Sequence, residues 1–155
     1  MVRHLFFPRG FPKDALPAIE QAIAASEATH RGEIRFAAED ALDGAALLAG
    51  QPGRARALEV FSQLGVWDTE ENNGVLVYLL LADHDIEIVA DRGINAKVGR
   101  EEWERICRGM EQALARGAYQ QAIVDGIAEI SRLLVRHYPA RAGDRNELSN
   151  APVRL

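Results

Sequence analysis

The sequence predicts an α/β fold, a three-layer α/β/α sandwich in which helices flank a small mixed sheet built from one parallel crossover and a β-hairpin. Two observations predict it. Residues 75–82 form the longest apolar run, and a strand without polar alternation is typical of a sheet covered on both faces. A strand, a helix and a second strand follow one another between residues 33 and 82, which favours parallel pairing through a right-handed crossover.

The first helix and the first strand are predicted from the spacing of their apolar residues. Residues 13–30 carry apolar side chains at helical spacing, and Gly32 ends this helix. Residues 33–39 alternate, with Ile34 and Phe36 on the apolar face of a strand. This segment therefore supplies one helix of an outer layer and one strand of the sheet.

The other elements follow in order along the chain. A helix is predicted over residues 54–64, between the first and second strands. A tight turn at 83–84 returns the chain as a third strand over 86–91, antiparallel to the second. Two more helices, over 100–116 and 119–137, carry apolar stripes and complete the outer layers.

The chain is predicted to form one domain with two short extensions. Its 155 residues, 48% of them hydrophobic, are enough for a single compact core. We expect residues 1–11 to form an N-terminal arm and residues 12–138 to form the domain. Residues 139–155 are polar and aperiodic, which predicts a flexible C-terminal tail.

Composition limits the classes of partner and the compartment. The formal net charge is −5 and no basic cluster is interleaved with aromatic residues, so we expect no nucleic-acid binding. The longest apolar run is far shorter than the roughly 20 residues of a membrane-spanning helix, so we expect no direct membrane insertion. Cys107 is the single cysteine, and the N-terminus lacks the apolar region of a secretory signal. These features favour a cytoplasmic protein.

The best candidate for a functional site is the acidic loop before the second strand, at residues 68–73. The hairpin brings Gly74 roughly opposite Gly93, so the loop is expected to lie beside Asp91 and Arg92. The crossover places Glu33 at the same edge of the sheet. Three segments that are distant in the sequence are therefore predicted to converge there.

Oxygen donors make this loop a candidate site for Ca²⁺ or Mg²⁺. The candidate ligands are Asp68, Glu70, Glu71, Asn72, Asn73 and Asp91. A helix-loop-helix calcium motif is excluded, because its sixth and twelfth positions hold Asn73 and Leu79 instead of glycine and glutamate. The alternative is a solvated loop whose asparagines and Gly74 simply make the turn into the strand.

Residues beside the loop are candidates for an anion site and for the cleft edge. Arg92 offers a guanidinium next to Gly93, which permits close approach of a phosphate group. Alternatively, Arg92 pairs with Glu70 or Glu71 across the end of the hairpin. Trp67 either covers the cleft, whose edge Glu33 would form, or packs against the sheet.

Two catalytic motifs are excluded by the residues themselves. The run Asp83-His84-Asp85 is similar to the nucleophile motif of haloacid dehalogenase-like phosphatases, but Glu87 replaces the threonine and the run reads as a turn. Cys107 lacks the arginine of a cysteine phosphatase, because position 113 is alanine. No catalytic residue is therefore assigned from the sequence.

The residues resemble those of the TPM domain family over about 12–138. The resemblance rests on Thr29-His30-Arg31-Gly32-Glu33-Ile34, on Asn72-Asn73-Gly74-Val75-Leu76 opening the apolar strand, and on the helix from Tyr119 to Ile127. It implies the three-layer fold, with the acidic loop bordering the cleft that is proposed for the family. Members include a thylakoid protein described as an acid phosphatase and proteins associated with membrane-protein maintenance.

The resemblance leaves two function classes open. Many relatives resemble exported or membrane-anchored proteins, and this sequence shows neither a signal nor an anchor, which suggests a soluble stand-alone variant. We expect a noncatalytic protein-binding module linked to membrane-protein maintenance, with a membrane-associated protein partner and a divalent cation in the acidic cleft. The alternative is a metal-assisted acid phosphatase that hydrolyses phosphomonoesters.

Overall fold

The computed structural model describes residues 10–155 apart from 43, 45–49, 51 and 142–149. Most of the expected N-terminal arm lies outside the described residues. The elements relevant to the site are all within them. No helix in this part of the chain combines the length and the apolar character that crossing a membrane requires.

The sheet has the mixed topology that the sequence predicts. Its strands lie in the order β3-β2-β1-β4, with β1 at Glu33–Glu39, β2 at Gly74–Leu80 and β3 at Asp85–Ala90. β1 and β2 pair in parallel, so the two strands begin at the same edge of the sheet. β2 and β3 pair antiparallel through the hairpin, so β3 ends at that edge as well.

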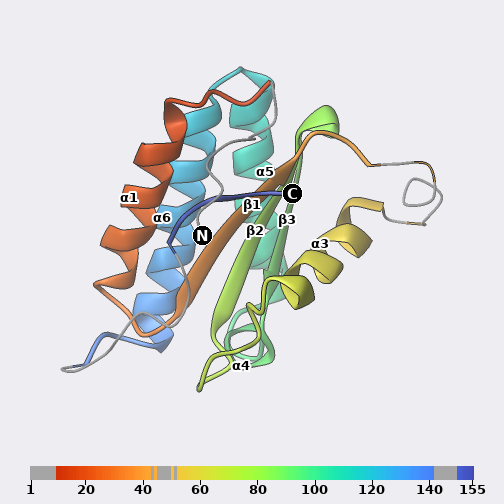
Figure 1. The fold of residues 1–155 in the computed structure, drawn as a ribbon. Helices are drawn as coiled ribbons and strands as arrows, with labels where there is room; N and C mark the ends of the chain where they lie inside the picture. Colours follow the sequence, from red (N-terminus) through yellow and green to blue (C-terminus); the bar gives the residue numbers. More distant parts are fainter. Residues whose placement is uncertain (1–9, 43, 45–49, 51, 142–149) are drawn as a thin grey trace.

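Helices cover both faces of the sheet, which makes the three layers (Figure 1). α1 (Ala15–Glu27), α5 (Arg100–Ala115) and α6 (Tyr119–His137) pack on one face. α3 (Pro52–Gln63) packs on the other face, against β2 and β3. All residues of β2 are buried, because this strand lies inside the sheet and under helices on both sides. The predicted three-layer sandwich is therefore confirmed.

The two layers beside the sheet are held by different chemistry. The side with α1, α5 and α6 is a large apolar core to which Ile34, Phe36 and Val77 contribute. The side with α3 is smaller and includes a polar cluster, in which the Tyr78 hydroxyl donates to Glu39 and Arg56 Nε donates to Glu39 Oε1 at 2.7 Å. This cluster links α3 to β1 and β2, and it thereby holds α3 in position beside β3.

The C-terminal end of the chain differs from the expected flexible tail. Val153–Arg154 forms β4, which pairs in parallel with β1 and is the fourth strand of the sheet. Ala151, just before it, is buried. The unpaired backbone groups of the β1 edge offer hydrogen bonds that the isolated segment lacks, and a two-residue strand is too short to show periodicity. The prediction for these residues was therefore wrong.

Two short elements frame the hairpin. η1 (Leu81–Asp83) is a single 3₁₀ turn that replaces the tight turn between β2 and β3, and His84 follows it with φ of 49°. α4 (Arg92–Asn95) begins directly after β3. The sequence predicts that the third strand runs to residue 91, whereas Asp91 caps a short helix there.

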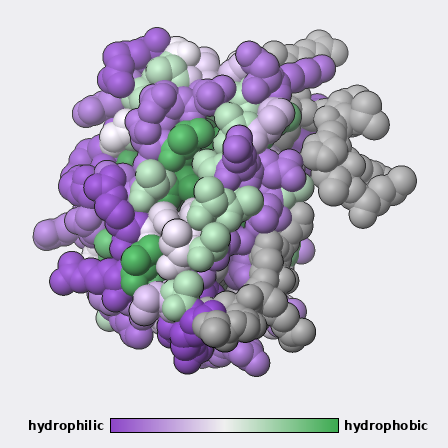
Figure 2. Space-filling model, turned by 90° about the vertical axis from the view of Figure 1, so that its left-hand side faces the viewer, coloured by the Kyte–Doolittle hydropathy of each residue, from purple (hydrophilic) through white to green (hydrophobic). Residues whose placement is uncertain are grey.

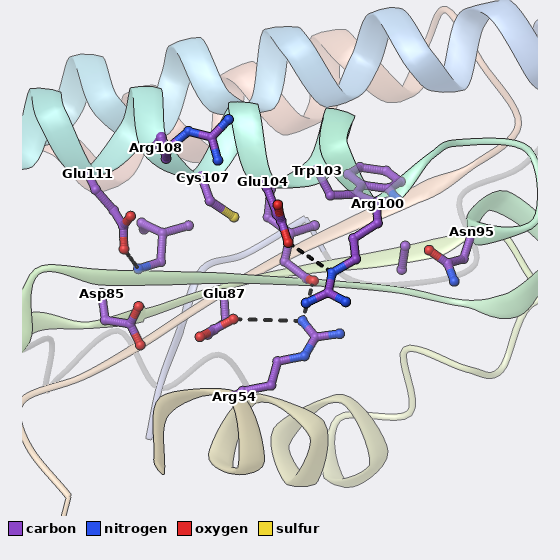
Figure 3. Close-up of a pocket in the computed structure, with 13 residues that line it drawn as sticks. Arg54, Asp85, Glu87, Asn95, Arg100, Trp103, Glu104, Cys107, Arg108 and Glu111 are labelled. Carbon is purple, nitrogen blue, oxygen red and sulfur yellow. Dashed lines mark hydrogen bonds and ion pairs between the residues drawn. The ribbon is translucent and has the colours of Figure 1, made fainter. Parts of the chain in front are cut away.

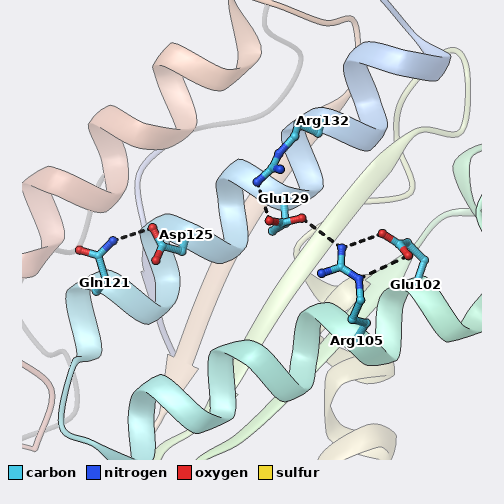
Figure 4. A network of polar contacts seen from close by, with 6 residues as sticks. All are labelled: Glu102, Arg105, Gln121, Asp125, Glu129 and Arg132. Atoms are coloured by element: carbon cyan, nitrogen blue, oxygen red, sulfur yellow. Dashed lines mark hydrogen bonds and ion pairs between the residues drawn. The ribbon is translucent and has the colours of Figure 1, made fainter.

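The outer surface of the three-helix layer is mostly polar. Seen from the side on which α1 lies, apolar side chains gather in the middle of the face and polar ones surround them (Figure 2). On α5 and α6, Arg105 donates to Glu102 at 2.7 Å and to Glu129 at 3.1 Å (Figure 4). These exposed ion pairs link the two helices at the solvent side, where screening by water weakens them.

Candidate functional site

The three predicted segments meet at one edge of the sheet. The Asp91 amide donates to Gly74 O at 2.9 Å, and the Ile94 amide donates to Asn72 O at 3.2 Å. On the other side of β2, the Glu33 amide donates to Asn73 O at 3.3 Å. The predicted convergence of the acidic loop with the end of β3 and the start of β1 is therefore seen in backbone hydrogen bonds.

Close backbone packing brings α4 against the loop. A Cβ atom on Gly93 would lie 2.3 Å from Glu71 O and 2.5 Å from Asn72 O, so only glycine fits there. Asn72 has φ of 53°, a left-handed conformation that asparagine tolerates better than most residues. The loop shape thus depends on the residue types at 72 and 93.

Two enclosed oxygen atoms at this edge have no hydrogen-bond donor among the described residues. Asn73 is 1% exposed, and its Nδ2 donates to Arg31 O at 3.3 Å, which leaves Oδ1 unpartnered. Asp91 Oδ1 accepts from the Arg92 amide at 2.8 Å, whereas Oδ2 is enclosed and unpartnered. A buried acceptor without a donor costs about 1–3 kcal/mol, so such oxygens are expected to have a water or ion partner.

Arg31 holds Glu71, a contact that the sequence did not predict. Its Nε donates to Glu71 Oε2 at 2.9 Å and its Nη2 donates to Oε1 at 3.1 Å. The Arg31 hydrogen bond is the main cause that lowers the pKa of Glu71. The pair considered between Arg92 and this glutamate is not made, because Arg31 reaches it from the α1–β1 connection. Glu71 must leave Arg31 at least in part before it can bind a cation.

The other candidate residues of the loop lie at the surface. Asp68, Glu70 and Arg92 are exposed, and Arg92 makes no ion pair with any described residue. Trp67 is 54% exposed and its indole N–H donates to Ser62 O at 3.3 Å, so it is not buried against the sheet, one of the two alternatives that the sequence left open. Across the described residues, no three His, Cys, Asp or Glu side chains are gathered as a metal site.

Glu33 lies beside a second carboxyl group, that of Glu27. It is 2% exposed, so its side chain does not form the rim of an open cleft. It interacts with Glu27, whose Oε1 accepts from the Ile34 amide at 2.8 Å. Burial raises the pKa of Glu27, and the neighbouring Glu33 raises it further. Helical periodicity alone could not identify Glu27 as the side-chain partner of Glu33.

His30 is neutral at physiological pH. It is 2% exposed, its Nε2 lies 2.8 Å from Ser26 Oγ, and burial lowers its pKa to about 4. A favourable interaction with the α1 dipole, which the position of His30 at the helix end suggests, would need the charged imidazolium. His30 therefore serves as a buried polar contact at the end of α1.

We expect the stability contributed by His30 to be lost in acid. Because its folded pKa lies below the unfolded value of 6.5, the unfolded state binds the proton first as the pH falls from 6.5 towards 4. The free energy of unfolding of the native protein should fall relative to that of His30→Gln by about 1–3 kcal/mol between pH 7 and pH 4.5. Denaturant titrations at several pH values measure this difference, and a constant difference would contradict the assignment.

The fold and the site define a three-layer α/β/α domain that carries an acidic, asparagine-bearing loop at one edge of its sheet. A model described as the TPM domain matches residues 11–133. The chain belongs to the TPM domain family, as the resemblance in its sequence indicated. No curated protein matches it.

Two solved structures are similar to this chain. The BA42 protein from the psychrophilic bacterium Bizionia argentinensis superposes with a TM-score of 0.81 at 28% identity, over 94% of this chain and 95% of that one. The N-terminal domain of a protein from P. gingivalis superposes with a TM-score of 0.59 at 17% identity, over 90% and 85% of the two chains. The second similarity shows the fold alone.

Proposed function

We propose that the protein is a noncatalytic binding domain that takes a divalent cation, Ca²⁺ or Mg²⁺, at the edge where the acidic loop meets Asp91, and that engages a protein partner linked to membrane-protein maintenance. The observation that supports cation binding is that one side-chain oxygen of Asn73 and one of Asp91 are enclosed and have no hydrogen-bond partner among the described residues. Both are hard donors of the kind these cations prefer.

The donor set suits a weakly held cation more than a tightly held one. An amide oxygen, a carboxylate oxygen, nearby backbone carbonyls and water can complete the shell of Ca²⁺ without a cluster of acidic side chains. Asp68 and Glu70 are exposed and free to move inwards, whereas Glu71 is restrained by Arg31. We expect a dissociation constant of about 10⁻⁴ to 10⁻³ M, typical of sites with few charged ligands.

Hydrolysis of phosphomonoesters is the second candidate function. The observation that favours it is the exposed guanidinium of Arg92, which directly follows Asp91 and is available to a phosphate group. In that role Arg92 would orient phosphate, while Asp68, Glu71 and Asp91 would hold the cation that activates water. The described residues at this edge add no evident general acid, which is why the binding function is preferred.

Titration with CaCl₂ and MgCl₂, followed by amide NMR, tests the proposed site. We expect shifts confined to residues 68–74 and 91–93, and a dissociation constant at least about tenfold larger for Asp91→Asn. Asparagine still caps α4 through its side-chain oxygen, so this variant removes charge with little change in fold. Asp125→Asn, on the solvent side of α6, is the matched control and should bind as the native protein does.

The outcomes separate the two functions. Diffuse shifts, or equal affinity of Asp91→Asn, would contradict a cation site at this edge. Cation-dependent turnover of p-nitrophenyl phosphate that is lost in Asp68→Ala/Asp91→Ala would favour the hydrolase. Turnover retained in that double variant would exclude the loop as its site.

A further inference from the structure

A groove runs along the edge of the sheet formed by β3, away from the acidic loop. It encloses about 490 Å³, with β3 as its floor and with α3 and α5 as its walls (Figure 3). Arg54 reaches it from α3, and Cys107 and Glu111 reach it from α5. The burial of Cys107 and nearby carboxylates raise the pKa of its thiol to about 12, so this cysteine is a lining residue and no nucleophile.

Side chains occupy backbone positions that a neighbouring strand would normally take. Among the described strands, β3 pairs only with β2, so alternate residues of β3 direct their backbone groups outwards. The outward amide of Ile86 donates to Glu111 Oε2 at 3.1 Å. The outward carbonyl of Ile88 accepts from Arg54 Nη1 at 2.6 Å. Glu111 and Arg54 thus supply the acceptor and the donor that a neighbouring strand would supply.

Both side-chain contacts are replaceable at small cost. Arg54 is 39% exposed, and its ion pair with Glu87 spans 3.8 Å, a kind of contact worth about 0–1 kcal/mol. Glu111 sits on the helix wall, so its carboxylate can turn away without moving α5. The backbone of an added strand would replace the side-chain hydrogen bonds at Ile86 and Ile88 with backbone hydrogen bonds. The number of hydrogen bonds at these two residues would stay the same, so the edge strand can accept a partner.

The acidic residues at one end of the groove favour a ligand with a basic side chain. Asp85 and Glu87 on β3 lie beside Glu111, and among the described residues Arg54 is the arginine that pairs with Glu87. Arg100 and Arg108 also line the groove, and Arg100 pairs with Glu104. Burial is the main cause that raises the pKa of Glu87 to about 7; Asp85 raises it further, and Arg54 lowers it only in part. A basic side chain that lies over Asp85 and Glu87 would offset the negative charge of these carboxyl groups.

A second copy of this chain does not fit the edge. In an antiparallel β3–β3 pairing, outward residues must face outward residues. Every register centred between residues 86 and 89 then sets carboxylates opposite each other: Asp85 with Glu87 or Asp91, or Glu87 with itself or Asp91. Like charges directly opposite destabilise a sheet. An antiparallel β3–β3 dimer is therefore disfavoured, and an extended segment that carries positive charge fits this edge better.

We propose that β3 accepts an extended peptide as an added strand, with an arginine or lysine side chain lying over Asp85 and Glu87. The added strand supplies backbone hydrogen bonds to Ile86 and Ile88, and the basic side chain sets its register. This surface gives the protein-binding part of the proposed function a place and a partner chemistry. It does not depend on the cation site.

Selection from a random peptide library on phage, with the full chain as bait and EDTA present, tests the proposal. We expect enriched peptides to alternate apolar residues and to carry a basic residue. An enriched peptide, made synthetically, should slow amide exchange at Ile86 and Ile88. Its affinity should fall about tenfold for Glu87→Gln and stay unchanged for Glu101→Gln, an exposed control outside the groove.

A backbone variant separates strand addition from simple charge attraction. Ala90→Pro removes an outward amide at the end of β3, where an edge strand tolerates proline, and should abolish binding. Amide spectra confirm that each variant is folded. No enrichment, equal binding to Ala90→Pro, or shifts confined to the loop at 68–73 would overturn the proposal. Equal binding to Glu87→Gln would overturn the basic-residue requirement. Loss of cation binding would leave all of these readouts unchanged.

Discussion

Replacing Glu27 with glutamine is expected to make the protein more stable at pH 8 and to leave its stability nearly unchanged at pH 4. Glu27 is partly buried as a whole, but its Oε2 is enclosed and has no hydrogen-bond partner among the described residues. Burial raises the pKa of this carboxyl above the ordinary value of 4.5, and Glu33 raises it further. Glutamine keeps an oxygen for the Ile34 amide and carries no charge.

The sign of the pH dependence follows from proton binding. Above pH 4.5 the unfolded chain releases the Glu27 proton while the folded chain keeps it, so the free energy of unfolding falls as the pH rises. The limiting slope for one group is about 1.4 kcal/mol per pH unit, and partial solvation reduces it. We expect Glu27→Gln to exceed the native protein by about 1–3 kcal/mol at pH 8.

Guanidinium denaturation of both proteins between pH 4 and pH 8 measures this effect. Glu20→Gln, a change of the same charge on the same helix, is the control and should show no comparable trend with pH. If Glu27→Gln were instead less stable at every pH above 5, Glu27 would be ionised and paired with Arg35. That result would contradict a protonated Glu27.

Replacing Gly93 with alanine is expected to destabilise the protein and to displace the acidic loop. The added methyl group would lie 2.3 Å from Glu71 O and 2.5 Å from Asn72 O, both backbone atoms that cannot rotate away. α4 must then separate from the loop, at a cost of about 1–3 kcal/mol, the usual range for overpacking. The hydrogen bond from the Ile94 amide to Asn72 O should break as well.

A second glycine supplies a matched control of opposite sign. Gly109 lies on the exposed side of α5 with nothing within 4 Å of a Cβ atom. Gly109→Ala should therefore stabilise the protein by about 0.5–1 kcal/mol, because alanine favours a helix interior. Thermal unfolding and amide exchange at residues 71–73 measure both variants. Unchanged stability and exchange in Gly93→Ala would show that the loop adapts freely.

Local sequence patterns predicted most of the fold because those patterns are long. The apolar run of β2 and the alternation in β1 predicted two strands, and the hairpin placed the acidic loop beside Asp91. β4 and α4 escaped prediction, because two to four residues carry no periodicity. β4 also depends on the free edge of β1, which exists only once the sheet has formed.

The sequence predicted the location of the candidate site better than the contacts within it. Register is a local consequence of the hairpin and the crossover, so the convergence of the three segments was predictable. Side-chain partners are not local. Arg31 and Glu71 are 40 positions apart, and nothing in either segment indicates that Arg31 rather than Arg92 would hold the glutamate.

The sequence by itself therefore determined the layers, the strand order from β1 to β3 and the edge at which polar residues gather. Apolar periodicity and chain connectivity act over short separations, and they suffice for these features. Only the tertiary structure decided which carboxyl groups are enclosed, such as Glu27 and Asp91, and which backbone edge of β3 stays open. Burial, charge pairing and unsatisfied hydrogen bonds depend on distances between segments that are remote in the chain, and folding alone sets those distances.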